Sequence, residues 1–403
     1  METYDAIDDI LNDELLRSVA APSELSESEA PTEAEKAPAE PPRRGSDRSR
    51  RPRKERREKV RGKTHPVLKF FLRLFTVLLV TLLLAVAALY GVMYVLAKGP
   101  SPTAQRLFVR SVRETSAAYF LADWFFTPEE IEEIENSGGT NELPEETDVS
   151  LVQIREPDAG PQPTDEYGLT DDDGDGIIVE PVSGPGFVGY MMVVLDPTRM
   201  MFGSPDYFGG VGLLVSEMVE KNDCVAGVNG GGFLDINGQG NGGTPIGMTI
   251  VDGQIYYGYE GSTYTFVGFD DSYILHTGQM TPADAREKNI QFGCTFGPVL
   301  VSNGEPVSST TLASGVNPRT AIGQRADGAV LLLVIEGRQA HSIGATFADL
   351  SDLMVQYGAV NACNLDGGGS SVMWYNGEYI ISSISFVGER PVATAFLVKK
   401  EGA

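Results

Sequence analysis

One apolar stretch constrains this chain more than any other feature. From Leu74 to Ala97 the sequence reads LFTVLLVTLLLAVAALYGVMYVLA. As a helix that rises about 1.5 Å per residue, this stretch crosses a hydrocarbon core about 30 Å thick. A buried helix of a soluble protein is disfavoured because the stretch has no polar face. A cleaved signal peptide is disfavoured because the stretch begins far from Met1 and exceeds an h-region in length. The sequence therefore predicts one transmembrane helix, with residues 67–97 as its bounds.

The charges that flank the span predict its orientation. The first 73 residues hold 16 of the 31 Lys and Arg residues, whereas Lys98, Arg106 and Arg110 are the first bases beyond the span. The positive-inside rule therefore places the N-terminus in the cytoplasm and the C-terminal part outside the cell. A nucleic-acid patch is the alternative for the basic run, but beside a spanning helix the run fits anionic lipid headgroups better. Residues 1–66 are predicted to be a disordered cytoplasmic tail, because residues 23–42 have almost no large apolar side chain.

Acidity beyond the span limits the partners of the outer part. The formal net charge is −25, yet the first 73 residues hold only 15 of the 56 Asp and Glu residues. An acidic surface repels polyanions, so nucleic acid is not expected as a partner, and an anionic substrate needs a local cationic or backbone-amide site. The three cysteines, Cys224, Cys294 and Cys363, are too few for a disulfide-built fold. At most one bridge is expected, and buried free thiols fit equally well.

Composition divides the outer part into a stalk and a domain. Residues 98–164 are predicted to form a helical stalk and an acidic linker, with two helices between Thr103 and Asn136 and with Thr127 capping the second. Residues 165–403 are predicted to form one α+β domain, a mixed β-sheet with a few helices and Gly-rich loops. The expected strands are Gly189–Leu195, Cys224–Val228, Gly247–Val251, Tyr264–Phe269, Ala329–Ile335 and Val392–Val398.

Two segments of the domain repeat one pattern. Each reads as a helix, a strand, and then a polar residue with three glycines, namely Asn229-Gly230-Gly231-Gly232 and Asp366-Gly367-Gly368-Gly369. Backbone without Cβ atoms is able to present amides to an oxygen-rich ligand, although a tight turn is the plain alternative. We expect both turns to face one cleft. Asp366 also ends an apolar strand, where α/β proteins place active carboxylates.

A hairpin is predicted after Asn317. If Asp327-Gly328 forms a two-residue loop, Arg319 lies directly opposite Glu336. The pair is then either a structural cross-strand ion pair or part of a site. In the second case Arg319 binds an anionic group, and Glu336 is a nearby acid, base or orienting group.

The metal and cofactor motifs in this sequence are incomplete. Gly238, Gly240 and Gly243 have dinucleotide-fingerprint spacing but follow no apolar strand and precede no helix. Asp171-Asp172-Asp173-Gly174-Asp175-Gly176 begins like a calcium loop, yet its twelfth position is Val182. An acidic turn is therefore favoured over a structural Ca²⁺ held by Asp171, Asp173 and Asp175. The three histidines lie far apart, so we expect no zinc site, no Ser-His-Asp triad and no cofactor.

Five motifs together resemble the phosphodiester glycosidase family. They are GVNGGGF (227–233), FGPVL (296–300), NPRTAIG (317–323), VIEGR (334–338) and NLDGGGSS (364–371), within a likeness that covers about Tyr190 to Lys399. The resemblance implies release of a sugar from a phosphodiester at its anomeric carbon. A departing phosphate monoester needs no strong general acid, so an anion site and one carboxylate suffice. Arg319 and the glycine-turn amides are expected to supply the first, and Asp366 or Glu336 the second.

The remaining candidate residues are substrate-binding or orienting groups. They are Asn229, Gly230, Gly231, Gly232, Thr346, Asn364, Gly367, Gly368, Gly369 and Ser370. Combined with the outward placement, the resemblance predicts a surface glycosidase that hydrolyses a sugar 1-phosphodiester of a cell-envelope glycopolymer or exopolysaccharide. A non-catalytic glycan-binding or envelope-assembly protein, and a transglycosylase that uses the same cleft, are the alternatives.

Overall fold

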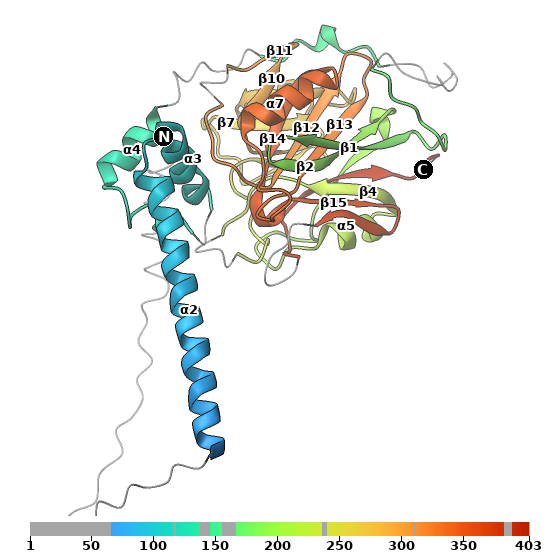
Figure 1. Cartoon of the computed structure of the whole chain (residues 1–403). Helices are drawn as coiled ribbons and strands as arrows, with labels where there is room; N and C mark the ends of the chain where they lie inside the picture. The colour runs from blue at the N-terminus through green and yellow to red at the C-terminus, as the bar shows by residue number, and fades with distance from the viewer. Residues whose placement is uncertain are drawn as a thin grey trace, which may run out of the picture. The chain divides into compact units, whose positions relative to one another are not determined.

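A long apolar helix opens the described part of the chain. The computed structural model describes residues 66–115, 118–137, 146–154, 167–235, 240–308, 312–382 and 389–402. The predicted tail, apart from Pro66, and the predicted domain start at Asp165 therefore lie outside the described residues. Helix α2 (Pro66–Lys98) contains the whole predicted span and is, within the described part, the one helix long and apolar enough to cross a membrane (Figure 1). The span is thus confirmed as a membrane-helix candidate.

Short helices follow α2 and share a small apolar core. They are α3 (Pro102–Arg113), the 3₁₀ turn η1 (Tyr119–Leu121) and α4 (Pro128–Asn136). The predicted cap is confirmed, because Thr127 Oγ1 accepts from Glu130 N while the Glu130 carboxylate accepts from Thr127 N, at 3.2 and 2.9 Å. The buried apolar residues here are Ala97, Val109, Ala122, Phe125, Phe126 and Ile131. We call α3, η1 and α4 the juxtamembrane helices.

Antiparallel sheets build the domain, which confirms the α+β class. The first, here sheet A, has the order β1-β2-β13-β12-β14-β10-β11, sheet B the order β16-β15-β4-β17-β3, and sheet C the order β6-β5-β9-β7-β8. Sheet A comprises β1 (Ile177–Gly184), β2 (Phe187–Val194), β10 (Val299–Ser302), β11 (Glu305–Pro306), β12 (Arg319–Arg325), β13 (Val330–Ile335) and β14 (Ala359–Leu365). Sheet B comprises β3 (Met200–Gly203), β4 (Cys224–Asn229), β15 (Val372–Tyr375), β16 (Glu378–Ser382) and β17 (Ala395–Lys399). Sheet C comprises β5 (Thr249–Val251), β6 (Gln254–Tyr256), β7 (Tyr264–Phe269), β8 (Leu275–Met280) and β9 (Phe292–Thr295).

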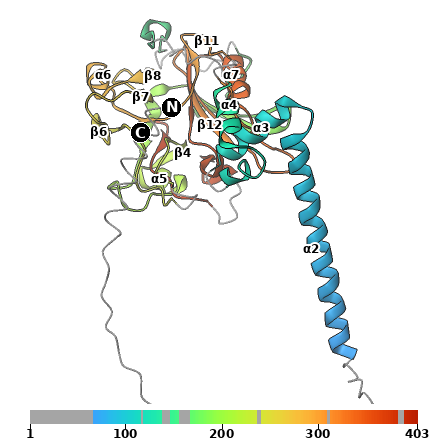
Figure 2. The same cartoon turned by 90° about the vertical axis from the view of Figure 1, so that its left-hand side faces the viewer.

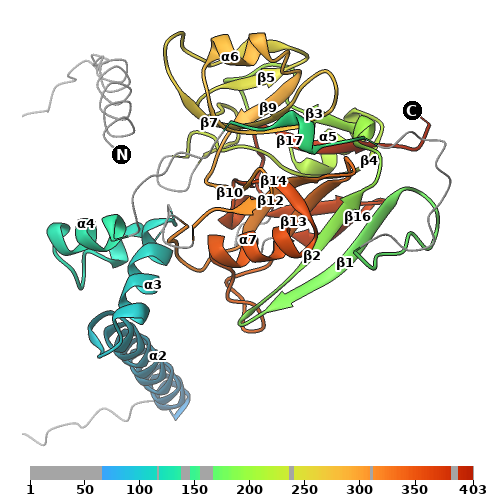
Figure 3. The same cartoon turned by 90° about the horizontal axis from the view of Figure 1, so that it is seen from above.

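The main core lies where the inner faces of the three sheets meet. Ile322 of β12, Phe396 of β17 and Phe269 of β7, one from each sheet, share one buried cluster. Each outer face is covered by a helix whose apolar side chains pack on it. Helix α7 (Phe347–Gln356) covers sheet A, α5 (Val215–Lys221) covers sheet B, and α6 (Pro282–Glu287) packs with sheet C (Figures 1 and 3). Figure 2 shows α6, β6, β7 and β8 together on one side of the domain. The sheets therefore bury apolar area on both faces, which stabilises a domain without disulfides.

Every strand expected from the sequence is present, with shifts of a few residues at the ends. Part of the predicted linker behaves differently, because its described residues bind the domain. Thr147 Oγ1 donates to Thr277 O at 3.1 Å, and Gln153 N donates to Ala326 O at 2.7 Å. The 3₁₀ turns η2 (Val149–Leu151), η4 (Pro197–Arg199) and η6 (Gly368–Ser370) complete the fold.

Candidate active site

The two glycine turns contact each other, whereas the expectation that both face one cleft stays a prediction. One follows β4 of sheet B and the other follows β14 of sheet A. Asp366 N donates to Gly230 O at 3.1 Å, and Asn229 Nδ2 donates to Asp366 O at 2.6 Å. The ends of two strands from different sheets are thus joined at the residue that carries the candidate carboxylate.

Asn229 positions this junction. Its side chain is fully buried, and its Oδ1 accepts from Thr320 Oγ1 at 2.8 Å and from Val372 N at 3.2 Å. Together with the bond to Asp366 O, these contacts connect β12, β15 and the Asp366 turn. Of the two roles open for Asn229 from the sequence, the contacts fit orientation of the turn better than contact with a sugar.

Asp366 has the environment of a functional carboxylate. The residue is half-buried, and its Oδ1 accepts from Gly367 N at 3.0 Å. Burial raises the pKa of Asp366 to about 6, against the opposing effects of a hydrogen bond from Ser370 and the positive charge of Arg390. A pKa near the working pH suits a group that acts as a base or attacks a carbon centre.

The glycines beside Asp366 allow close packing. Gly368 N donates to Pro318 O at 2.9 Å, and a Cβ on Gly367 would lie 2.8 Å from the same oxygen. Gly368 has φ +59°, which glycine adopts at little cost. In the other turn, Gly230 N and Gly231 N are bonded to Thr394 O and Thr394 Oγ1. The expectation that these amides bind a phosphate is therefore corrected for Gly230, Gly231, Gly367 and Gly368, whose N–H groups have partners within the protein.

Three arginines lie around the Asp366 turn. A Cβ on Gly367 would be 3.8 Å from Arg319 Cα and Cδ, one on Gly368 would be 3.1 Å from Arg338 Nη2, and one on Gly369 would be 3.6 Å from Arg390 Cδ. Cation density of this kind favours an anionic group beside the carboxylate. The sequence identified only Arg319 among them.

Arg338 and Arg390 are therefore site candidates that the sequence reasoning missed. Arg338 ends the VIEGR motif and has φ +59°, an uncommon value for a residue with a Cβ and one that clusters at functional sites. Arg390 is bound by Asp235, with Nη1 2.8 Å from Oδ2, and by Gly240 O at 3.1 Å from Nη2. The motif gave a signal for Arg338, whereas nothing local in the sequence marks Arg390.

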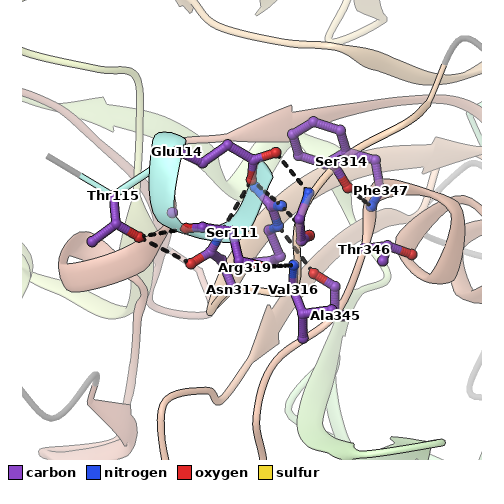
Figure 4. Close-up of polar contacts among 12 residues, drawn as sticks. Ser111, Glu114, Thr115, Ser314, Val316, Asn317, Arg319, Ala345, Thr346 and Phe347 are labelled. Carbon is purple, nitrogen blue, oxygen red and sulfur yellow. Dashed lines mark hydrogen bonds and ion pairs between the residues drawn. The ribbon is translucent and has the colours of Figure 1, made fainter. Parts of the chain in front are cut away.

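Arg319 is held tightly and is 5% exposed (Figure 4). Its Nε donates to Ala345 O at 3.2 Å, its Nη2 donates to Gly315 O at 2.8 Å, and its guanidinium lies 4.1 Å from the centre of the Phe347 ring. The same Nη2 is 2.6 Å from Glu114 Oε2, at the end of α3. Burial lowers the pKa of Arg319, and the Glu114 charge opposes this effect.

The expected pairing of Arg319 with Glu336 is wrong by one residue. Arg319 pairs with Ile335, and Arg325 N donates to Ala329 O at 2.9 Å, so the hairpin loop has three residues. Gly328 in that loop has φ +93°, as three-residue loops require. A shift of one residue turns a side chain to the opposite face. Glu336 accordingly bonds His341 Nε2 at 2.7 Å and Gln339 Nε2 at 3.4 Å, and within the described residues it has no contact with Arg319.

The remaining candidates have mixed positions. Thr346 caps α7, because its Oγ1 accepts from Asp349 N at 3.2 Å and donates to Asp349 Oδ2 at 2.6 Å. Asn364 is buried and its Nδ2 donates to Gly297 O at 2.8 Å, while its Oδ1 has no partner within the described part. Gly232 lies beside the Phe296 ring, which a Cβ would approach to 2.8 Å. Ser370, a further candidate, donates a side-chain hydrogen bond to Asp366.

The aspartates of the calcium-like loop lie close together. The carboxylate oxygens of Asp171, Asp173 and Asp175 lie within 4.8 Å of one another. Asp171 accepts from Gly174 N and Gly176 N at 2.9 and 3.0 Å, and Asp175 accepts from Ile177 N at 2.8 Å. These bonds are internal to the turn, and the choice between an acidic turn and a Ca²⁺ site stays a prediction.

The three cysteines are free and buried. Burial raises the pKa of Cys224 to about 11 and also raises the pKa values of Cys294 and Cys363. Thiolate chemistry at neutral pH is therefore disfavoured.

Comparison with known proteins bears on the domain. Residues 222–399 match the family model described as phosphodiester glycosidase. The SPbeta prophage-derived uncharacterized protein YomE of Bacillus subtilis (strain 168) is 32% identical over 214 residues, which are 51% of this chain and 31% of that protein. The chain thus spans about a third of the length of this curated relative.

Solved structures are similar at lower identity. The zebrafish N-acetylglucosamine-1-phosphodiester alpha-N-acetylglucosaminidase catalytic domain, auto-inhibited by pro-peptide, is 21% identical with a TM-score of 0.47, over 56% of this chain and 82% of that chain. A putative exported protein of Burkholderia pseudomallei K96243 is 19% identical with a TM-score of 0.39, over 56% and 76% of the two chains. The family match covers the Asn229 and Asp366 turns, Arg319, Arg338 and Arg390. Residues 222–399, which hold these groups, are thus similar to the phosphodiester glycosidase family.

Proposed function

We propose that this chain hydrolyses a sugar 1-phosphodiester and that Asp366 is the carboxylate that acts at the anomeric carbon. One observation carries the proposal, namely that a carboxyl group with a pKa of about 6 lies in a turn bordered by Arg319, Arg338 and Arg390. The carboxylate suits the oxocarbenium-like carbon, and the arginines suit the phosphate. The match of residues 222–399 to the phosphodiester glycosidase family model supports the same reaction class.

The reaction needs few groups because the leaving group is stable. The bond between the anomeric carbon and the phosphate oxygen breaks, and its electron pair leaves with the phosphate monoester. Water adds to the anomeric carbon and loses one proton. Asp366 either takes this proton or first attacks the carbon itself, and both routes end in a free sugar and a phosphate monoester. Arginines that contact the departing phosphate stabilise its developing charge without a proton transfer.

Glu336 is a less favoured candidate for the carboxylate. Its side chain is bonded to His341 and Gln339. Its register on the opposite face from Arg319 separates it from the arginine that it was expected to accompany. We propose Glu336, which is paired with His341, as an acid or base in second place after Asp366.

The apolar helix supports a proposal that the reaction takes place outside the cell, at the membrane surface. With α2 in a membrane and the basic tail in the cytoplasm, the domain faces the outside of the cell, where phosphodiester-linked glycopolymers of the envelope are its proposed substrates. We infer no nucleic-acid partner, no required metal and no cofactor. A non-catalytic glycan-binding role is the second candidate, and transfer of the sugar to an acceptor other than water is the third.

Sugar release by the purified full chain tests the proposal. The chain in detergent is incubated with UDP-N-acetylglucosamine and with an aryl phosphodiester of the same sugar, and chromatography identifies the products. We expect sugar release by the native chain, none by Asp366→Asn, and full release by Asp172→Asn, which changes an exposed carboxylate of the same domain. Release by Asp366→Asn at the native rate would refute the assignment. Tight binding of glycan without release across a broad panel would favour the binding role, and new glycosides formed with added glycerol would favour transfer.

A further inference from the structure

Gly315, Asn317 and Arg319, just before and at the start of β12, form a group of hydrogen-bond donors that we call the anion cradle. All three donate to one carboxylate, that of Glu114. Gly315 N donates to Glu114 Oε1 at 2.7 Å, while Asn317 Nδ2 and Arg319 Nη2 donate to Oε2 at 3.0 and 2.6 Å (Figure 4). Both oxygens of a singly charged group are thus bound by a backbone amide, a side-chain amide and a guanidinium. This donor set is the kind that binds phosphate oxygens as well.

The domain itself builds the cradle. Arg319 is fixed by Gly315 O, Ala345 O and the Phe347 ring, all of which belong to the domain. Its Nη1 makes no hydrogen bond to any described residue, so the guanidinium keeps donors for a further oxygen. Because the side chain is buried and charged, the cradle needs an anion at all times.

A second arginine extends the cradle towards Asp366. Arg338 Nη2 donates to Asn317 Oδ1 at 3.3 Å and to Thr115 Oγ1 at 3.0 Å, and none of the described carboxylates pairs with it. The positive charge of Arg319 contributes, after burial, to a lowered pKa of Arg338. Two arginines and one glutamate leave a net positive charge, which a phosphate group with more than one anionic oxygen neutralises better than a carboxylate does.

Glu114 lies outside the sheets that carry the other cradle residues. It follows α3, whose apolar face packs in the small core of the juxtamembrane helices, a cluster without domain residues. Its neighbours reach the domain by polar contacts. Ser111 Oγ accepts from Val316 N at 2.8 Å, and Thr115 Oγ1 contacts Asn317 Oδ1 at 3.3 Å. Polar contacts of this type exchange with water at small net cost, so these neighbours add little to the free energy that holds Glu114 in place.

We propose that Gly315, Asn317, Arg319 and Arg338 bind the phosphate of a phosphodiester substrate beside Asp366, and that Glu114 occupies this site in competition with it. The inference rests on the proposed function for the identity of the substrate. The cradle adjoins the catalytic turn. Gly368 N donates to the carbonyl of Pro318 at 2.9 Å, and Pro318 is the residue between Asn317 and Arg319 in the chain. Substrate binding therefore displaces the Glu114 carboxylate, and the juxtamembrane helices set the apparent affinity.

Titration with inorganic phosphate tests the cradle without any need for catalysis. The full chain is kept in maltoside micelles, whose headgroups carry no phosphate, and calorimetry gives the Kd. We expect Glu114→Ala to bind phosphate roughly tenfold more tightly than the native chain, because the intramolecular competitor is gone. Glu132→Ala is the matched control, since it removes an exposed glutamate of α4 and should leave the Kd unchanged.

Further variants separate a binding site from a structural ion pair. Arg338→Gln should weaken phosphate binding in the Glu114→Ala background, because glutamine keeps a polar side chain here but removes the positive charge. The same titration is repeated in nanodiscs of phosphatidylcholine, whose headgroups carry phosphate. If Glu114→Ala no longer binds inorganic phosphate more tightly than the native chain there, lipid headgroups occupy the cradle. That outcome overturns the assignment of the cradle to the substrate. A Glu114→Ala chain that melts earlier but binds phosphate with the native Kd also overturns the inference.

The outcomes distinguish this inference from the proposed function. Sugar release by the native chain, with the same KM and the same phosphate Kd in Glu114→Ala, leaves the function standing and removes the competition. Tighter phosphate binding in Glu114→Ala by a protein that hydrolyses no phosphodiester keeps the anion cradle and overturns the function.

Discussion

Asp366 should destabilise the fold at neutral pH, and the variant Asp366→Asn makes this measurable. Burial raises the pKa of the carboxyl group from its ordinary value of 3.8 to about 6. The unfolded chain therefore releases the proton first as the pH rises, and the fold loses stability between about pH 4 and pH 6. At about 1.4 kcal/mol per pH unit, the loss above pH 6 amounts to at most about 3 kcal/mol, an upper bound because the residue keeps some contact with solvent.

Asparagine has the same shape without the charge, so Asp366→Asn should be more stable than the native chain at pH 7.5. For a domain of this size, about 3 kcal/mol corresponds to a rise in Tm of roughly 6–12 °C. The difference should shrink towards zero near pH 4, where the native carboxyl group is protonated. The assay is thermal unfolding of the full chain in detergent, followed by tryptophan fluorescence from pH 4 to pH 8.

Asp172→Asn controls for the removal of one negative charge from the domain. A Tm difference between Asp366→Asn and the native chain that is the same at pH 4 and pH 7.5 would refute the reasoning, because burial of the charge would then not be its cause. A lower Tm for Asp366→Asn at pH 7.5 would refute it as well. The activity assay gives an independent check, since sugar release should fall as the pH drops below about 6.

Three further predictions follow from neighbouring contacts. Ser370→Ala removes a hydrogen bond that lowers the pKa of Asp366, so the acid limb of the pH–rate profile should move to higher pH, and a move to lower pH would contradict this assignment. Asn229→Ala leaves Thr320 Oγ1, Val372 N and Asp366 O without a buried partner, so urea unfolding should show a loss of about 3 kcal/mol or more. The three buried thiols should not react with a maleimide in the native chain and should all react in urea, whereas rapid labelling of native Cys294 would show that its strand opens locally.

Much of the fold was accessible from the sequence because its signals are local. The apolar span, the Thr127 cap and the strands each depend on residues within a short window, and each is present. The α+β class followed from them. The hairpin register did not, because a two-residue and a three-residue loop both suit Asp327-Gly328, and only the backbone of Gly328 decides between them.

Part of the candidate site could be predicted from the sequence. The glycine turns and Asp366 were identified because three glycines after an apolar strand are unusual. The contact of Glu114 with Arg319 joins residues 205 positions apart, and neither has a local pattern that points to the other. Thr346 was misleading because a helix cap and a sugar-binding hydroxyl have the same side chain, and its hydrogen bonds to Asp349 identify the cap. Chemistry that depends on long-range packing is therefore where the sequence alone fell short.

The left-handed backbone of Arg338 has a consequence for directed evolution. A residue with a Cβ costs about 1 kcal/mol or more in this conformation, and glycine does not. In a library randomised at position 338, selection for folding alone should enrich glycine and asparagine. Selection for sugar release should instead retain arginine, because relief of the backbone strain does not compensate for the loss of the guanidinium beside the Asp366 turn. The two selections would then diverge at a single codon, and the size of that divergence would measure how much stability the site gives up for its charge.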